Sequence, residues 1–131
     1  IVFPQTTLPL DTCIAQYTND LQSLWSIADT DISVLGMGDD GHIASLFPPL
    51  TDNLMDDTAL VHHTTTDRFA VHDRITLSLH AIAASKSSLV LLKGEAKRRV
   101  WDDLMASPEG EKRWPLKRIM ESTEMTTLWS A

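Results

Sequence analysis

A histidine and two aspartates lie in a glycine-rich segment, residues 36–48, whose sequence is GMGDDGHIASLFP. Glycines allow backbone conformations that other residues rarely adopt, and they let a ligand approach the main chain closely. A neutral His42 imidazole can accept a proton from water near neutral pH, and Asp39 or Asp40 could orient that ring. The segment therefore predicts acid–base chemistry, with His42 as the candidate general base and Asp40 as the candidate orienting group.

Two structural interpretations compete with this one. His42 could cap a helix that begins near Ile43, and Asp40 could serve only as a turn residue. The segment directly follows an apolar run, residues 32–35, which is typical of a buried strand. Because catalytic groups often lie in loops at the ends of strands, this placement favours a functional role for His42.

A second glycine turn follows a second apolar run, residues 88–93. Gly94 is expected to lead into a helix with Lys97 in its first turn, where free backbone amides and the helix dipole attract anions. On the sequence alone, a solvated helix residue is the favoured interpretation of Lys97. Arg74 opens an alternating segment and could reach the same sheet edge, whereas the sequence gives Arg68 no predictable location; Arg98 and Arg99 fit a solvated helix face.

Other chemistries find little support. The histidines at positions 62, 63, 72 and 80 lack helical metal-ligand spacing and a completing cysteine or carboxylate, so no metal site is predicted. Ser45 lies in A-S-L rather than in the G-x-S-x-G pattern of a serine hydrolase. Cys13 falls within a predicted amphipathic helix, where a structural role is expected.

The pattern of apolar residues predicts an α/β domain with a mostly parallel sheet over residues 1–131. In such sheets ligands bind beyond the carboxyl ends of the strands, where both glycine turns fall. The two continuous apolar runs suggest strands covered on both faces. The predicted helices span residues 11–26 (capped by Asp11 or Thr12), 80–84 and 95–107, with short helices beginning at 43–46 and near Pro115. The predicted strands span residues 32–35, 73–79, 88–93 and 123–129, with weaker candidates at 60–61 and 69–71.

Composition narrows the class of protein. The chain has 131 residues, of which 43% are hydrophobic, and a formal net charge of −7. This charge argues against nucleic acid or an anionic membrane as the partner. No apolar run is long enough to span a membrane, and the first residues lack the pattern of a secretory signal. The single cysteine, Cys13, excludes an internal disulfide and favours a reducing compartment, so a cytoplasmic location is expected.

The segment GMGDDGHIASLFP resembles the G-M-G-x-D-G-H-x-x-S-L-F-P signature of the 6-phosphogluconolactonases. Residues 73–79 (DRITLSL) and 91–97 (LLKGEAK) are similar to two further segments of that family, in the same order. The resemblance implies a Rossmann-like, mostly parallel sheet flanked by helices, and hydrolysis of the lactone 6-phosphogluconolactone to 6-phosphogluconate without metal or other cofactor.

The same resemblance implies roles for individual residues. His42 matches the family's general base and Asp40 the adjacent acidic residue. Gly38 and Gly41 would border the substrate, a small sugar-phosphate lactone. Lys97 and Arg74 match positions suited to the phosphate and the developing carboxylate.

The segment is also similar to the D-G-H segment of glucosamine-6-phosphate deaminases, which have the same fold. Those enzymes carry an acidic residue five positions after the histidine. Here that position is Phe47, which favours the lactonase. A third alternative is an inactive sugar-phosphate-binding fragment. The family's early phosphate loop, S-G-G-S/T-T-P, and its G-D-E-R segment have no counterpart here. We therefore expect these residues to be the carboxyl-terminal portion of the family fold, with low activity alone and exposed apolar sheet edge.

Overall fold

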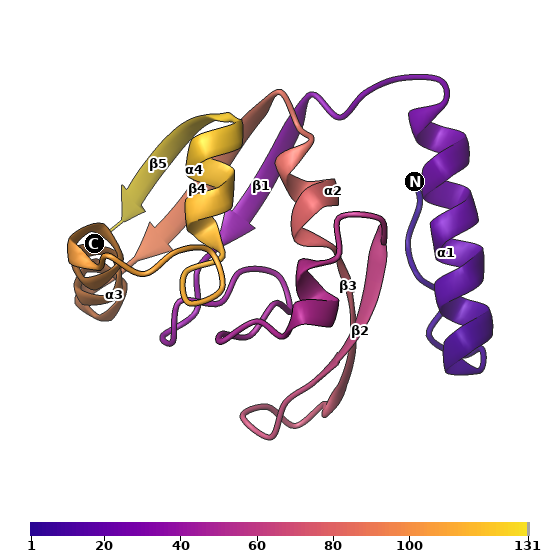
Figure 1. Ribbon diagram of the computed structural model, residues 1–131, viewed down its shortest axis with the longest axis horizontal. Helices are drawn as coiled ribbons and strands as arrows, with labels where there is room; N and C mark the ends of the chain where they lie inside the picture. The colour runs from indigo at the N-terminus through magenta and orange to yellow at the C-terminus, as the bar shows by residue number, and fades with distance from the viewer. Residues whose placement is uncertain (131) are drawn as a thin grey trace.

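The computed structural model describes residues 1–130 and contains two β-sheets with helices around them (Figure 1). A parallel sheet of three strands has the order β1 (Ile32–Gly36), β4 (Ser87–Lys93), β5 (Glu124–Ser130). A separate antiparallel pair is formed by β2 (Val61–Thr65) and β3 (Asp73–Leu77). The expected α/β class with a mostly parallel sheet is confirmed.

The parallel sheet brings the two glycine turns together. Ile32 pairs with Ser87 and Gly36 with Leu91, so β1 and β4 run side by side in the same direction. Gly36 ends β1 and Gly94 follows β4, which places both turns at the carboxyl edge of the sheet. Residues separated by more than fifty positions in the sequence thus meet at one edge.

Helices pack against one face of this sheet and enclose the core. α3 (Glu95–Ala106) follows β4, and α4 (Leu116–Ser122) leads into β5 and lies across the sheet in Figure 1. α2 (Leu79–Ala83) packs beside α4. Leu104, Leu116 and Ile119 are fully buried, and they join Val90 and Leu92 of the sheet in one hydrophobic cluster. Burial of such side chains is the main stabilising contribution in a domain of this size.

The opposite face of the sheet is open within residues 1–130. Ile32 and Val34 are 62% and 61% exposed, and Leu91 and Leu128 on the neighbouring strands are also exposed. The apolar run 32–35 had suggested a strand covered on both faces, but here only Leu35 of that strand is buried. An apolar sheet face of this kind normally packs against another element.

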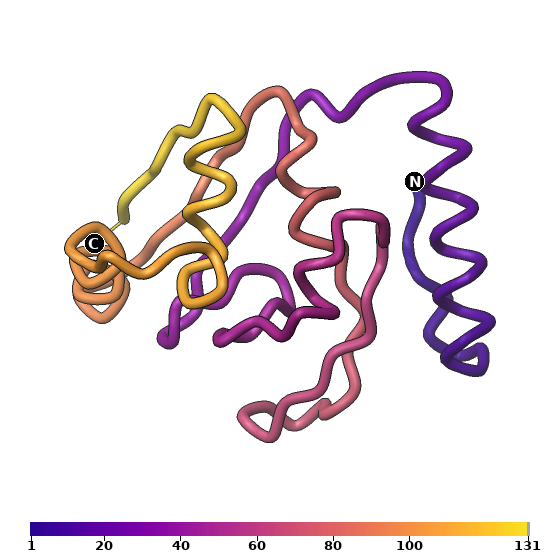
Figure 2. The backbone as a smooth tube through the Cα atoms, viewed as in Figure 1, coloured from indigo at the N-terminus to yellow at the C-terminus, as the bar shows by residue number. Residues whose placement is uncertain are grey.

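The N-terminal region lies apart from the parallel sheet. α1 (Leu10–Trp25) packs against β2, and Figure 2 shows the first residues running back along this helix. Cys13 and Leu21 are its buried residues. No helix in residues 1–130 has the length and apolar character needed to cross a membrane.

Three local predictions are wrong. Residues 43–46 do not begin a helix: Ile43 and Leu46 form an isolated antiparallel bridge, and Ala44 between them has a φ of 49°. Residues 69–71 form part of the β2–β3 loop instead of a strand. α1 begins at Leu10 after Pro9, without a side-chain cap, so Asp11 lies inside its first turn, where a negative charge suits the helix dipole.

Most remaining boundaries lie within two residues of expectation, although the weak strand candidate at 60–61 is the longer β2, which ends at Thr65. β3 ends at Leu77, where Ser78 caps α2 by accepting a hydrogen bond from the Ala81 amide at 3.0 Å. Pro115 precedes α4 directly, as a proline with a fixed φ can at a helix start. Between β1 and β2 the chain forms only a short 3₁₀ helix, η1 (Asp52–Met55).

Candidate active site

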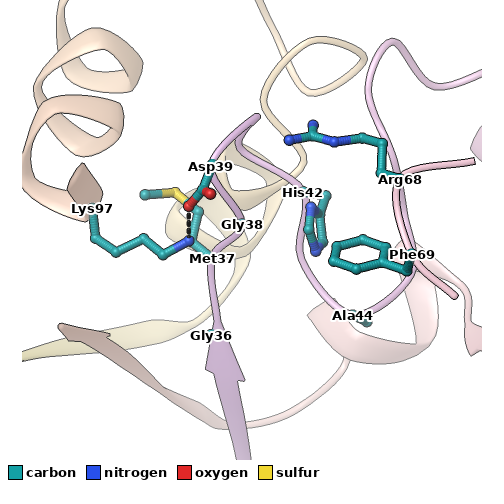
Figure 3. A pocket seen from close by; sticks show the side chains of 9 residues that line it. All are labelled: Gly36, Met37, Gly38, Asp39, His42, Ala44, Arg68, Phe69 and Lys97. Carbon is teal, nitrogen blue, oxygen red and sulfur yellow. Dashed lines mark hydrogen bonds and ion pairs between the residues drawn. The ribbon is translucent and has the colours of Figure 1, made fainter. Parts of the chain in front are cut away.

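A cavity of about 600 Å³ opens at the carboxyl edge of β1, between the two glycine turns and the β2–β3 loop. Figure 3 shows the His42 and Phe69 rings packed side by side, with Arg68 above them and Lys97 reaching in from α3 beside Asp39. The side chains and glycines that line the cavity are Gly36, Met37, Gly38, Asp39, His42, Ala44, Arg68, Phe69 and Lys97. Its volume falls in the range of small-molecule sites.

His42 and Asp40 form a hydrogen-bonded pair. The Nδ1 atom of His42 lies 2.6 Å from Oδ1 of Asp40, and the same oxygen accepts a hydrogen bond from the His42 amide at 3.1 Å. Since a carboxylate can only accept, the proton of a neutral imidazole lies on Nδ1. The Nε2 atom then carries the free lone pair, which is the state a general base requires.

The environment keeps Asp40 ionised. Partial burial raises the pKa of this carboxyl, but the hydrogen bonds from the His42 amide and ring and the charges of His42 and Arg68 outweigh it. The net pKa is therefore lowered from 3.8. Asp40 thus remains an acceptor for His42 at neutral pH.

The glycine turn is shaped around the histidine ring. The Gly38 amide donates to the His42 carbonyl at 2.8 Å, and the Gly41 amide donates to the Gly38 carbonyl at 3.1 Å. A Cβ atom at Gly38 would overlap the His42 ring. Gly38 lines the cavity, whereas Gly41 does not. The backbone amides of both glycines already donate hydrogen bonds within the turn, so neither is free for a ligand.

Two phenylalanines pack against the His42 ring. The ring centroid of Phe47 lies 4.7 Å from that of His42, and the centroid of Phe69 lies 5.8 Å away in an edge-on arrangement. These contacts restrict the imidazole plane while its Nδ1 is fixed by Asp40. Phe69, which lines the cavity, also makes one side of it apolar.

Lys97 brings a positive charge into the cavity from the first turn of α3. Its ammonium pairs with Asp39 of the first glycine turn, and its side chain is 25% exposed. The hydrogen bond and the charge of Lys97 lower the pKa of Asp39. The ion pair thus connects the ends of β1 and β4, and it places the lysine on the same side of the sheet as His42.

Arg68 is the cavity residue that sequence reasoning could not place. Its guanidinium pairs with Oδ2 of Asp40, so this carboxylate is held between His42 and Arg68. The residue lies in the loop between β2 and β3, and only the pairing of those two strands carries it to the cavity. Its position has no periodic pattern that could have revealed it.

Arg74 occupies a different position from the one expected. It does not line the cavity; its Nε donates to the Val71 carbonyl at 3.2 Å, and its guanidinium lies 4.9 Å from the centre of the Phe69 ring. Arg74 therefore contacts the site only through the β2–β3 loop. Within residues 1–130, no group of three or more His, Cys, Asp or Glu side chains is arranged to hold a metal ion.

Comparison with known proteins relates the chain as a whole to a family. Residues 2–129 match the family described as glucosamine-6-phosphate isomerases/6-phosphogluconolactonase. A protein of Dictyostelium discoideum named probable 6-phosphogluconolactonase is 45% identical over 123 residues, which cover 92% of this chain and 52% of that protein.

Solved structures show the same relationship. A 6-phosphogluconolactonase from Plasmodium vivax superposes with a TM-score of 0.80 at 25% identity, covering 98% of this chain and 55% of the other. One from Shewanella baltica gives a TM-score of 0.71 at 33% identity, with coverages of 90% and 52%. The chain thus spans about half the length of the relatives it matches.

Proposed function

Because this chain belongs to the glucosamine-6-phosphate isomerase/6-phosphogluconolactonase family, we propose that it serves the hydrolysis of 6-phospho-D-glucono-1,5-lactone to 6-phosphogluconate, in the oxidative branch of the pentose phosphate pathway. The observation that carries the proposal is the Asp40–His42 pair at the edge of the cavity, 2.6 Å between Oδ1 and Nδ1. This pair leaves Nε2 of His42 unprotonated and able to take a proton from a water molecule.

The reaction needs one base and no redox group. The Nε2 atom of His42 takes a proton from water as the oxygen attacks the lactone carbonyl carbon. The C–O bond of the ring then breaks, and the imidazolium returns the proton to the departing ring oxygen. Asp40 stabilises the imidazolium in between, because its carboxylate stays ionised beside Nδ1.

Two cations of the cavity suit an anionic substrate. Lys97 and Arg68 both line the cavity that contains His42, and either can pair with a phosphate or carboxylate oxygen. Gly38 lets the substrate approach beside the ring. We assign phosphate or carboxylate binding to Lys97. The cavity lining includes neither Arg74 nor Gly41, so nothing in the site supports a direct contact of these two residues with substrate, and both contacts stay predictions.

The alternative activity, deamination of glucosamine 6-phosphate, is less well supported by the site. In the deaminase pattern an acidic residue five positions after the histidine partners it, and Phe47 occupies that position. The Phe47 ring packs on His42 and offers no group that transfers a proton. This contact favours the lactonase.

The test is lactone hydrolysis measured above the spontaneous rate with protein expressed from its complete coding sequence. Native protein and His42→Ala are compared, with His80→Ala as control, because His80 is an exposed residue of α2. Loss of the enzymatic rate in His42→Ala alone supports the proposal. Equal rates for native protein and His42→Ala contradict it, and ammonia release from glucosamine 6-phosphate would support the deaminase instead.

A cytoplasmic location belongs to the same proposal. The single cysteine, Cys13, is buried and free, and free thiols are usual in reducing compartments. A human relative is named GDH/6PGL endoplasmic bifunctional protein. Fractionation of cells that express a tagged protein distinguishes the cytoplasm from the endoplasmic reticulum.

A further inference from the structure

Arg113 contacts the first glycine turn, which carries Asp40 and His42, from a distant part of the chain. Its Nη1 donates a hydrogen bond to the Asp40 carbonyl at 2.9 Å, although the two residues are 73 positions apart. This carbonyl belongs to the peptide group that joins Asp40 to Gly41. Arg113 does not line the cavity, so its contact with the site is through the main chain of the turn.

Trp114 supports the same peptide group from beside it. A Cβ atom at Gly41 would lie 2.6 Å from Cζ3 of Trp114 and 3.4 Å from Nη1 of Arg113, so the absent side chain leaves the space that both residues use. The Arg113 guanidinium lies 3.7 Å from the centre of the Trp114 ring. Stacking on an indole restricts the guanidinium plane, which favours a fixed direction for the hydrogen bond to Asp40.

The segment that carries both residues is anchored in the core. Trp114 is only 4% exposed, and Leu116 after it is fully buried. The amides of Arg113 and Trp114 both donate to the Gly110 carbonyl at 3.0 Å, and the Lys112 carbonyl accepts from the Leu50 amide at 2.8 Å. The turn around Asp40 is therefore held against a buried and hydrogen-bonded part of the molecule.

From these contacts we propose that Arg113, stacked on Trp114, is a positioning residue that fixes the Asp40–Gly41 peptide and thereby the alignment of Asp40 with His42. Rotation of that peptide would move both hydrogen bonds that Asp40 makes, one to the His42 amide and one to the ring. The catalytic consequence rests on the proposed function, whereas the alignment itself can be observed without turnover.

The alignment is read from the His42 ring proton in ¹⁵N-labelled protein. A proton held on Nδ1 against a carboxylate at 2.6 Å exchanges slowly with water and gives a downfield NMR signal, which His42→Gln identifies by its absence. Arg113→Met is expected to remove this signal or to speed the exchange of the ring proton with water by at least about tenfold. The reason is that the Asp40 carbonyl loses the hydrogen bond that fixes it. Arg113→Lys keeps the charge and the stem over Trp114 and is expected to restore part of the signal.

Arg98→Met is the matched control. The Arg98 guanidinium also stacks on a tryptophan, 4.1 Å from the centre of the Trp129 ring, but it does not contact Asp40. Thermal unfolding of the variants separates a general loss of stability from a local one. If Arg113→Met does not fold, the comparison of Arg113→Lys with native protein decides, and a weakened His42 signal is still required.

Kinetics provide a second measurement. In active protein Arg113→Met is expected to lower kcat on the order of tenfold or more with KM changed less than about twofold, since a misplaced base affects the transition state more than binding. An unchanged His42 signal in Arg113→Met, or no such signal in native protein, overturns the positioning role. If the His42 signal responds to the Arg113 substitutions as expected but native protein does not hydrolyse the lactone, the proposed function is refuted and the positioning role stands.

Discussion

Asp40→Asn tests the proposed chemistry with little change in shape. The amide would still fill the space between His42 and Arg68, but it has one accepting oxygen where the carboxylate has two. If its NH₂ group faces Nδ1 across the 2.6 Å contact, the imidazole proton moves to Nε2 and the ring can no longer accept a proton from water. If its oxygen faces Nδ1, the uncharged amide no longer stabilises the imidazolium. The Arg68 guanidinium also loses its charged partner.

The expected size of the effect follows from these contacts. A hydrogen bond to a charged group contributes about 1.5–3 kcal/mol, which corresponds to roughly ten- to hundredfold in rate. The tautomer change adds to this, and the equivalent substitution in serine proteases lowers kcat by about 10⁴. We therefore expect kcat to fall between roughly a hundredfold and ten-thousandfold, with a small change in KM.

The assay is acid release from freshly prepared 6-phosphogluconolactone, corrected for spontaneous hydrolysis. Asp52→Asn is the matched control, because Asp52 is also an ion-paired carboxylate, bound to Lys112, but lies on the surface with a side chain 94% exposed. The control is expected to retain the native rate. A kcat for Asp40→Asn within about threefold of native, in folded protein, would refute the role of this pair in setting the tautomer.

Three further predictions concern other residues. Gly38→Ala places a methyl group in the space of the His42 ring and is expected to reduce kcat at least about tenfold; Gly110→Ala, whose Cβ would meet nothing within 4 Å, is the control, and equal rates for the two variants would contradict the steric argument. Lys97→Met removes a cation of the cavity and is expected to raise the Kd for 6-phosphogluconate about tenfold or more in calorimetric titrations at low salt; an unchanged Kd would exclude it from anion binding. Burial lowers the pKa of His62 from 6.5, with partial compensation by the charge of Asp56. As the pH falls below 6.5, His62 therefore binds a proton more readily in the unfolded chain than in the folded protein. The free energy of unfolding declines over this pH range. Urea unfolding at about pH 7.5 and about pH 5.5 is expected to show a smaller decline for His62→Leu than for native protein; equal declines would contradict this linkage.

The sequence predicted the parts of the site that follow directly from strands. His42 and Lys97 each lie a few residues beyond an apolar run, and the parallel pairing of β1 with β4 brings them to one edge. Arg68 could not be predicted, because its location depends on the register of the β2–β3 pair. Arg113 reaches Asp40 only through tertiary packing, and no local pattern encodes a contact between residues 73 positions apart.

The incorrect helix at residues 43–46 has a similar cause. The Ser45 amide and carbonyl bond to the hydroxyls of Thr76 and Thr64, at 3.3 Å and 2.9 Å. These partners on β3 and β2 hold the segment in a non-helical conformation. Local propensity was overridden by hydrogen bonds to strands that come later in the sequence.

Within the cavity, the Asp39 carboxylate pairs with Lys97 and so competes with anionic ligands for this lysine. A phosphate that binds Lys97 competes with a carboxylate tethered nearby, and such a group acts at a high effective concentration. Once displaced, Asp39 loses the hydrogen bond that depresses its pKa, so anion binding in acidic solution is coupled to proton uptake. At neutral pH Asp39 remains charged and close, and it can reclaim Lys97 as the product leaves. The pair therefore weakens the binding of every anionic ligand at Lys97, substrate and product alike.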